Sequence, residues 1–358
     1  MTDWTGENYK LRLTGASHDD YVGAVFSGMK KGEKIDFSAV DELVALRRPC
    51  ENAYSTKRRE SDEYEFIGGV DGEGFSTGED LVVRIKNRDV RKGDYEGTRA
   101  VMRPSHADYA AFVKYGESAL KPGGGIFSGR MTAPLCVIGG VALGILKKRG
   151  VSVTGYLSSV GDVRFGSYDD ESFVLPEKSA AFSLADERTK ALADDLFARL
   201  AKEGDSVGGI IECVLSGVPA GVGDAQFGCL ESRISSLMFG IPAVKAVEFG
   251  FGKNFGGALG SEVRDEPYYD GDKVKTRTNF NGGINGGISN GMPIAVRVTV
   301  KPTPSIAKPC RTINVNEKRE TLLEIKGRHD VCIAPRAVAA VVAAASIALF
   351  DAIGEKYE

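Results

Sequence analysis

Hydrophobic positions recur along the chain with two different periods, and together they predict a protein that mixes helices and strands. Residues 37–48 repeat apolar side chains at helical spacing, and Asp36 or Ser38 is available to cap the helix. Residues 293–301 alternate strictly between apolar and polar side chains, which is the period of a strand. The same reasoning predicts further strands at 11–13, 22–27, 81–86, 151–157, 207–214 and 244–249, and further helices at 105–115, 131–148, 183–202, 230–239 and 336–352.

Two stretches, 133–146 and 334–350, are apolar on every side. They are too short, or built from residues too small, for a membrane span, and we expect buried core helices. Pro335 suits the first turn of the second helix. Residues 1–9 are polar, so no signal peptide and no membrane partner are expected.

The two halves of the chain echo each other in the same order. VFSGMKKG at 25–32 resembles VLSGVPAG at 214–221, and FSTGEDLVVRIKN at 75–87 resembles ISNGMPIAVRVTVK at 288–301. The apolar helix at 133 parallels the one at 335. We therefore predict an α+β fold in a single domain over 1–358, with pseudo-symmetric halves at about 1–180 and 181–358 and mainly antiparallel sheets around the two buried helices.

Composition narrows the classes of partner. The net charge of −3 over 358 residues gives no basic field for nucleic acid, and only the short run Lys57–Arg59 suggests it. The six cysteines form no C-x-x-C pair, which indicates a reducing, cytoplasmic setting and no metal site. The 45 glycines cluster at 123–125, 250–260 and 282–291, which indicates special turns or close approach of backbone to a ligand.

The stretch RPSHADYAAFVKYG at 103–116 holds one of only three histidines. Ser105 and Asp108 have the spacing of a capping box, so a helix is expected to begin at Ser105. His106 would then sit in its first turn, where a capping or packing role is the simplest interpretation.

The other two histidines also lie in short polar motifs, His18 in GASHDD and His329 in GRHD. Each alone could be a solvated or structural residue. Arginines gather near the same motifs, and arginine beside glycine-rich backbone suits a polyanion because guanidinium groups pair bidentately with carboxylate and phosphate. An imidazole beside a phosphate can protonate it as it leaves.

The chain resembles the chorismate synthase family over nearly its whole length. The segments that carry the resemblance run from GASH near the start to GRHD and PRAV near the end. Between them lie RPSHADYAAFVKYG, GGG-x-x-S-x-R-x-T (123–132), KEGDSVGG (202–209), SGVPAGVG (216–223), AVKAVEFGFG (243–252), NGGINGGISNGMPI (281–294) and KPTPSI (301–306). So many matches in one order are specific to the family.

The resemblance implies a β-α-β sandwich and a lyase of the shikimate pathway. In that family 5-enolpyruvylshikimate 3-phosphate loses phosphate and a proton to give chorismate, in the presence of reduced FMN. His18 is then expected to protonate the leaving phosphate, His106 to protonate the reduced flavin, and Asp330 to assist removal of the ring proton. NADPH as reductant, a homotetramer and a cytoplasmic location are further expectations.

The binding residues are also carried over by position. The anionic substrate is expected at Ser17, Arg48, Arg130 and Arg328. The flavin is expected at Arg47, Ile126, Phe127, Ser128, Pro242, Ala243, Gly286, Lys301, Pro302, Thr303, Pro304, Ser305 and Arg328.

Some positions depart from the family pattern. Asp19 follows the Ser-His pair where the family places a glutamate before it, at Ala16. Ala53, Ile126 and Pro242 stand where arginine, arginine and asparagine are usual. Losing such contacts weakens anion binding, so the alternative is a diverged paralogue that binds flavin or an anion without the lyase activity.

Overall fold

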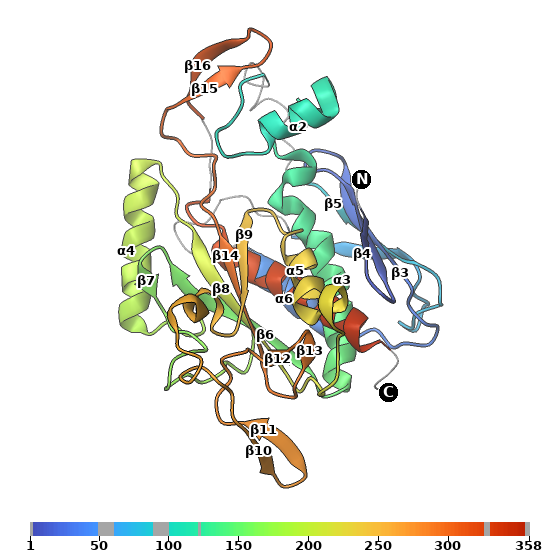
Figure 1. The fold of residues 1–358 in the computed structure, drawn as a ribbon. Coiled ribbons are helices and arrows are strands. Elements are labelled where there is room, and N and C mark those ends of the chain that lie inside the picture. Colours follow the sequence, from blue (N-terminus) through green and yellow to red (C-terminus); the bar gives the residue numbers. More distant parts are fainter. Residues whose placement is uncertain (1–2, 49–60, 89–99, 121–122, 326–329, 355–358) are drawn as a thin grey trace.

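Two five-stranded sheets enclose a layer of helices, as seen in the computed structural model (Figure 1). The structure describes residues 3–48, 61–88, 100–120, 123–325 and 330–354. The first sheet has the order β1-β2-β3-β5-β4 and every neighbouring pair is antiparallel. Its strands are β1 (Asp3–Thr5), β2 (Lys10–Gly15), β3 (Tyr21–Ser27), β4 (Tyr64–Gly68) and β5 (Leu81–Lys86).

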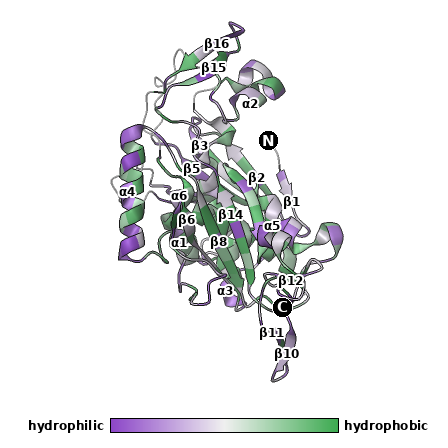
Figure 2. Cartoon of the chain, turned by 60° about the vertical axis from the view of Figure 1, so that its left-hand side comes forward, coloured by the Kyte–Doolittle hydropathy of each residue, from purple (hydrophilic) through white to green (hydrophobic). Residues whose placement is uncertain are grey.

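The second sheet has the order β7-β6-β8-β14-β9 and is likewise antiparallel throughout. Its strands are β6 (Ser152–Val160), β7 (Val163–Arg164), β8 (Gly209–Ser216), β9 (Val244–Phe249) and β14 (Ile294–Val300). The sheet takes β6 and β7 from before residue 180, the approximate division that the repeats suggested. Figure 2 shows hydrophobic residues (green) along β8 and β14 in the interior.

Three helices fill the space between the sheets: α1 (Phe37–Arg47), α3 (Thr132–Lys148) and α6 (Ala334–Ile353). Side chains of all three belong to one continuous hydrophobic core that also takes residues from both sheets. α3 and α6 approach closely because Gly139 faces Ala343: a Cβ atom on Gly139 would lie 2.3 Å from that of Ala343. Both helices are long and apolar enough to cross a membrane, yet 89% of each is buried inside the protein, as expected for core helices.

The remaining helices lie outside this layer. The amphipathic α4 (Glu187–Glu203) covers the outer side of the second sheet, α5 (Leu230–Met238) packs on α6, and α2 (Asp108–Tyr115) stands apart (Figure 1). Three small hairpins complete the fold: β10 (Pro267–Asp270) with β11 (Lys273–Thr276), β12 (Ile284–Asn285) with β13 (Ile288–Ser289), and β15 (Cys310–Asn314) with β16 (Arg319–Leu323).

The repeated sequences occupy equivalent places in the two sheets. The first pair of repeats contains the ends of β3 and β8, and the second pair contains β5 and β14. β3 lies beside β5, and β8 beside β14, near the middle of each sheet. The α+β class and the sandwich of antiparallel sheets around buried helices are therefore confirmed.

One expected element begins elsewhere. The helix predicted from Ser105 starts at Asp108, and the capping box is wrong, because the residue before the helix makes no side-chain capping bond. Ser105 has a positive φ of 60°, which no helix can contain. The carboxylate of Asp108 instead accepts hydrogen bonds from Arg103 and His106.

Candidate active site

The first histidine motif is a turn between β2 and β3 that rests on the glycine-rich loop before α3. The backbone N–H of buried Ser17 donates to the carbonyl of Gly125 at 3.2 Å. The hydroxyl of Ser17 lies 2.9 Å from Nδ1 of His18. The amide of Asn87, at the end of β5, donates to the carbonyl of Asp19 at 2.7 Å. The turn is thus held on both sides, and Nδ1 of His18 is already engaged.

The His18 ring lies directly against Gly123. A Cβ atom at Gly123 would fall 2.1 Å from Cε1 of His18, which is closer than any packed carbon atoms. Gly123 also has φ of +71°, a conformation that favours glycine. The first glycine of the GGG motif therefore makes room for the histidine.

The second histidine is bound to a carboxylate. Nδ1 of His106 lies 2.5 Å from Oδ1 of Asp108, and both groups are partly buried. Arg103 pairs with the same carboxylate through Nε at 2.7 Å and Nη2 at 2.8 Å. Burial alone would raise the pKa of Asp108, but the hydrogen bonds from Arg103 and His106 hold it well below its usual range. Nη2 of Arg103 also donates to the carbonyl of Gly123 at 2.8 Å, so the two histidine motifs are joined.

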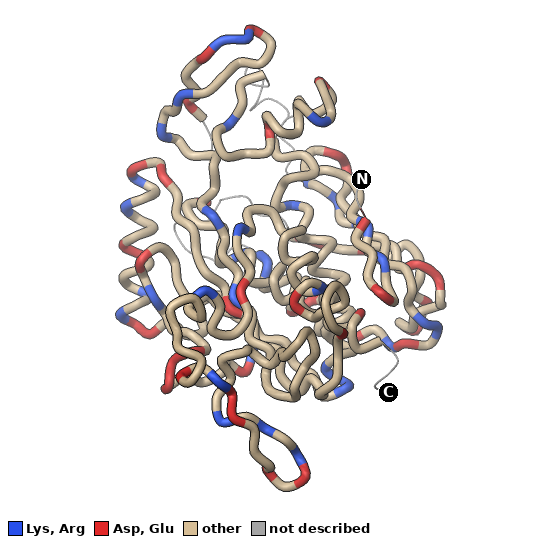
Figure 3. Tube along the Cα trace, in the orientation of Figure 1, with Lys and Arg blue, Asp and Glu red and all other residues tan. Residues whose placement is uncertain are grey.

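Lys301, at the end of β14, connects the His106 loop to β9. Its ammonium donates to the carbonyl of Ser105, and its backbone N–H donates to that of Ala243 at 2.9 Å. Ser105 and Ala243 both have positive φ, 60° and 73°, which is uncommon for residues other than glycine and concentrates at ligand sites. Burial and then the charge of Lys245 lower the pKa of Lys301. Two cations therefore face one region, and Figure 3 shows basic residues (blue) around the upper ends of β9 and β14.

Two of the predicted arginines are deeply buried and share one carboxylate. Arg47 lies 2.5 Å from Asp62, and Arg130 pairs with the other oxygen of the same residue. Arg47 also donates to the hydroxyl of Thr132 at 2.9 Å and the carbonyl of Gly129 at 3.1 Å. In this structure both guanidinium groups bind protein oxygens around the glycine-rich loop, so their contacts to a ligand stay predictions.

Asp330 extends the same cluster from the other half of the chain. Its carboxylate pairs with Arg336 of α6 at 3.0 Å, and Nε of Arg336 lies 3.5 Å from the carbonyl of Arg47. Burial lowers the pKa of Arg336 even though Asp330 opposes the effect. Hydrogen bonds and ion pairs thus lead from Asp330 to the glycine-rich loop.

The other predicted residues differ in how closely they join this group. The hydroxyl of Ser128 accepts from the backbone N–H of Arg130 at 3.2 Å, and the carbonyl of Thr303 accepts from Ser206 at 2.8 Å. Ile126 and Phe127 are 48% and 41% exposed. Of the other residues predicted to bind a ligand, Ser305 is buried, Pro242 and Pro304 are half-buried, and Pro302 and Arg48 are exposed.

Among the predicted flavin-binding residues that the structure describes, Gly286 lies away from the others. It forms the turn of the β12–β13 hairpin, which packs at the Ile294 end of β14, whereas Lys301 follows the opposite end (Figure 1). Seven strand residues separate the two ends by about 20 Å. Arg328, His329, Ala53 and Lys57–Arg59 lie outside the described residues.

Several residues of the site were missed by sequence reasoning. Asp62 and Asn87 orient the buried arginines and the His18 turn, and Arg336 binds Asp330. Asp62 carries no local motif, because it acts only through partners far away in the chain, and Arg336 lies in the PRAV motif but was given no role. The glycine-rich loop was the sequence signal that pointed to this region. It contains Arg130, which donates a hydrogen bond to the side chain of Asn87 at 2.8 Å.

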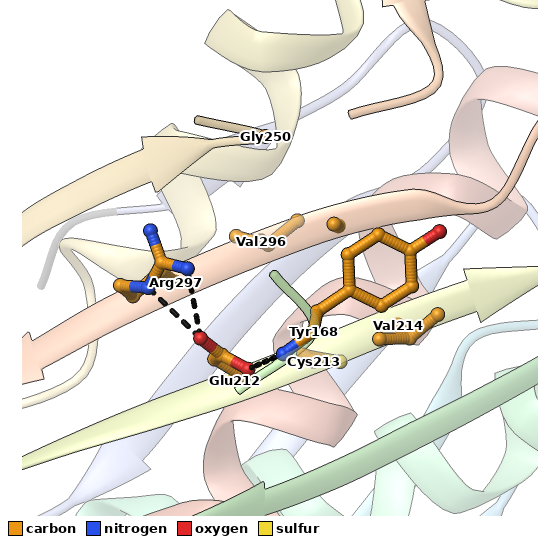
Figure 4. A pocket seen from close by; sticks show the side chains of 8 residues that line it. Tyr168, Glu212, Cys213, Val214, Gly250, Val296 and Arg297 are labelled. Atoms are coloured by element: carbon orange, nitrogen blue, oxygen red, sulfur yellow. Dashed lines mark hydrogen bonds and ion pairs between the residues drawn. The ribbon is translucent and has the colours of Figure 1, made fainter. Parts of the chain in front are cut away.

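Two hollows in the described part of the chain lie elsewhere. A cavity of about 10 Å³ lies beside Glu212, whose buried carboxylate accepts from Arg297 at 2.9 Å and from the backbone N–H of Tyr168 at 2.8 Å (Figure 4). It holds about one water molecule, so it is no organic ligand site. An open groove of about 670 Å³ beside η5 (Gly252–Gly257) is lined by Phe251, Lys253, Asn254, Gly257, Ala258, Glu262, Val263 and Phe280. None of these residues was predicted to bind a ligand.

Comparison with known proteins agrees with the resemblance read from the motifs. The family model described as chorismate synthase matches residues 9–353. The chain is 37% identical over 368 residues to the chorismate synthase of Lancefieldella parvula, covering 99% of this chain and 96% of that protein. It is 38% identical over 347 residues to that of Parabacteroides distasonis, covering 97% and 96%.

A solved structure shares the fold. The crystal structure of a chorismate synthase superposes with a TM-score of 0.74 at 24% sequence identity, and covers 97% of this chain and 92% of that one. The relatives named here are all chorismate synthases, so the comparisons give no support to the diverged alternative. The chain therefore belongs to the chorismate synthase family and is an enzyme, a lyase of aromatic biosynthesis.

Proposed function

We propose that this enzyme is a carbon–oxygen lyase that acts on a phosphate ester. It would convert 5-enolpyruvylshikimate 3-phosphate to chorismate by anti-1,4-elimination of phosphate and a proton. The observation that carries the proposal is the joint anchoring of the two described histidines, because the Arg103 guanidinium connects His106 to the loop against which His18 lies. Two proton-bearing groups held by one scaffold suit an elimination in which protons move at two places.

His18 is suited to the departing phosphate. Its Nδ1 lies 2.9 Å from the Ser17 hydroxyl, and we assign the proton that the leaving group takes to Nε2. The second pKa of a phosphate, ~6, lies close to the ~6.5 of an ordinary histidine, so transfer between them is nearly balanced at neutral pH. The hydroxyl of Ser17 fixes which nitrogen is presented.

The residues around Lys301 fit the anionic cofactor that the family requires. The positive charge of Lys245 lies close enough to lower the pKa of Lys301, and an anion bound there would stabilise both charges. We propose that Ala243, Lys301, Thr303, Ser305 and Ser128 hold reduced FMN, with Arg47 acting indirectly through the glycine-rich loop. When bound, reduced FMN supplies electron density to the allylic system of the substrate.

Asp330 is proposed to assist removal of the ring proton in the second part of the elimination. Its carboxylate is held by Arg336 at 3.0 Å, which fixes its position. Arg48, Arg130 and Arg328 are proposed to bind the substrate's anionic groups. Arg130 belongs to the scaffold described above, because its backbone N–H donates to the hydroxyl of Ser128 and its guanidinium pairs with Asp62.

The wider setting follows the family resemblance. We propose a cytoplasmic, homotetrameric flavoprotein, with NADPH as the candidate reductant of the flavin. The cysteines support a reducing compartment, since the described ones are all free thiols, and burial raises the pKa of Cys136 to about 12.

The test is an anaerobic assay with reduced FMN in excess and the enolpyruvyl phosphate ester as substrate. Phosphate release and chorismate formation at equal rates are expected, and His18→Ala should lower turnover by about 10²–10⁴-fold. A parallel FMN titration separates the diverged alternative: tight flavin binding without phosphate release would sink the lyase proposal.

A further inference from the structure

The carboxylate of Asp108 is the centre of the contacts that hold the His106 loop. Oδ1 lies 2.5 Å from Nδ1 of His106 and 2.8 Å from Nη2 of Arg103. Oδ2 accepts from Nε of Arg103 at 2.7 Å and from its backbone N–H at 3.0 Å. Both oxygens are used, and 19% of the Asp108 side chain is exposed, so it has a fixed place.

We propose that Asp108 is a positioning residue that fixes the tautomer of His106, and that Arg103 keeps its carboxylate in place. The inference rests on the proposed function, in which His106 holds a proton beside the ligand. It assigns the presenting atom as Nε2.

The chemistry of the donors leads to this assignment. An ionised carboxylate only accepts hydrogen bonds, so Nδ1 of His106 must carry a proton in both charge states of the ring. The neutral ring then has a bare Nε2, and the charged ring carries a second proton there. When the charged ring acts, the Nε2–H bond breaks and the proton passes to the bound acceptor, while Nδ1–H stays on Asp108 and solvent later restores Nε2.

The charged groups around His106 are consistent with an anionic Asp108. On its own loop Arg103 faces the carboxylate, and from the end of β14 Lys301 reaches the carbonyl of Ser105. Two cations and one carboxylate therefore surround the ring among the described contacts. The pKa of Asp108 lies well below its usual range, so the acceptor is ionised at neutral pH.

The same arginine extends the positioning to the other histidine. Nη2 of Arg103 donates to the carbonyl of Gly123, and Gly123 lies against the His18 ring. One guanidinium group thus contacts both the carboxylate that holds His106 and the loop against which His18 lies. Losing its fork should therefore disturb both histidines.

The experiment uses Asp108→Asn in the full chain. An amide can donate where the carboxylate only accepts, so the proton of the neutral ring should move from Nδ1 to Nε2, as in serine proteases with the equivalent change. The ring nitrogens are read by ¹⁵N NMR without any ligand, and His106→Gln identifies the signals among the three histidines. Glu117→Gln, an exposed charge change just after α2, is the matched control.

Kinetics give the second reading. Asp108→Asn should lower kcat by about 10²–10⁴-fold with little change in KM, and the alkaline limb of the pH–rate profile should move to lower pH. Asp108→Glu should restore part of the rate because it restores the carboxylate.

Two results would overturn the proposal: an unchanged Nδ1–H tautomer in Asp108→Asn, or a rate loss with the alkaline limb unmoved, which would indicate a structural role.

Should Asp108→Asn fail to fold, Asp108→Glu and Arg103→Lys provide the test. Both keep a carboxylate at 108, so both should keep Nδ1–H, and loss of that tautomer in either would overturn the assignment. A chain without lyase activity would refute the proposed function, yet the NMR result would still decide the role of Asp108.

Discussion

At the scale of single residues, the site depends on a glycine as much as on charged side chains. Gly123 gives His18 its place, because the imidazole occupies the volume that any Cβ would need. Its carbonyl also receives Arg103 at 2.8 Å. The His18 ring and an ion-paired loop are therefore held by a residue that has no functional group.

Gly123→Ala should lower turnover by about 100-fold, since a shift of about 1 Å in a reacting group has that effect. The new methyl would lie 2.1 Å from His18 and would also strain a backbone with φ of +71°. Gly129→Ala is the control in the same loop, because its Cβ would meet nothing within 4 Å. Steady-state kinetics of both variants check this, and equal rates would contradict the packing argument.

The ion pair of Asp108 should also make stability depend on pH. Its pKa is lower in the folded protein than the ~3.9 of an unfolded chain, so its contribution is complete above about pH 4 and is lost as pH falls through the lower folded value. The gap in urea midpoint between the wild type and Asp108→Asn should shrink as pH falls from about 5 towards 3. A gap of the same size at pH 3 and pH 5 would argue against a lowered pKa.

At the scale of elements, the sequence predicted the helices and strands of the core well and the small hairpins poorly. The strand at 81–86 and the strand at 244–249 agree with β5 and β9 at both ends, because each is a short segment with several β-branched or aromatic residues next to turn residues. The strands β10, β11, β15 and β16 were not predicted. Their residues are largely exposed, so no burial pattern marks them.

Residues of the candidate site could be predicted where they belong to a local motif. They could not be predicted where the contact joins segments that are distant in the sequence. His18, His106 and Lys301 stood out in the sequence, and the structure brings their loops into contact. The pairing of Arg47 and Arg130 through Asp62 could not be read, because a salt bridge across the fold leaves no period or spacing. The cap predicted at Ser105 failed for a local reason, since the carboxylate of Asp108 binds Arg103 and His106 instead.

The end of α6 offers a test of one element's role. Buried Asp351 accepts the backbone N–H groups of Glu7, Asn8 and Tyr9 at 2.9, 2.8 and 3.0 Å, and so joins α6 to the segment before β2. Asp351→Ala should lower the free energy of unfolding by about 3 kcal/mol, because buried charge-assisted hydrogen bonds are lost together. Denaturant unfolding measures this, with exposed Asp195→Ala of α4 as control. A loss no larger than that of the control would show that the segment holds by other contacts.

At the scale of the whole molecule, the two sheets share one layer of helices. The hydrophobic core runs without a break from β2 and β3 through α3 and α6 to β8 and β14. Neither sheet has a separate core that it could keep if the other unfolded. The pseudo-symmetry of the halves therefore does not divide the protein into two independent stability units.

Calorimetry should accordingly show one cooperative transition for the full chain at low concentration. The reason is that separating the sheets would expose both faces of the helix layer, whose apolar surface stabilises the fold by ~25 cal/mol per Å². The ratio of calorimetric to van't Hoff enthalpy measures this, and Gly139→Leu, which forces α3 from α6, should lower the midpoint without splitting the peak. Two resolved transitions would refute a single unit.

The central place of α6 has a consequence for synthesis on the ribosome. α6 is the last helix along the described chain, yet it packs against strands of the second sheet and against α1, α3 and α5, and its Asp351 holds the segment before β2. The hydrophobic core thus stays incomplete until residues 334–353 have left the ribosomal exit tunnel. Before that point the nascent chain should be a strong client of chaperones that bind exposed hydrophobic surface.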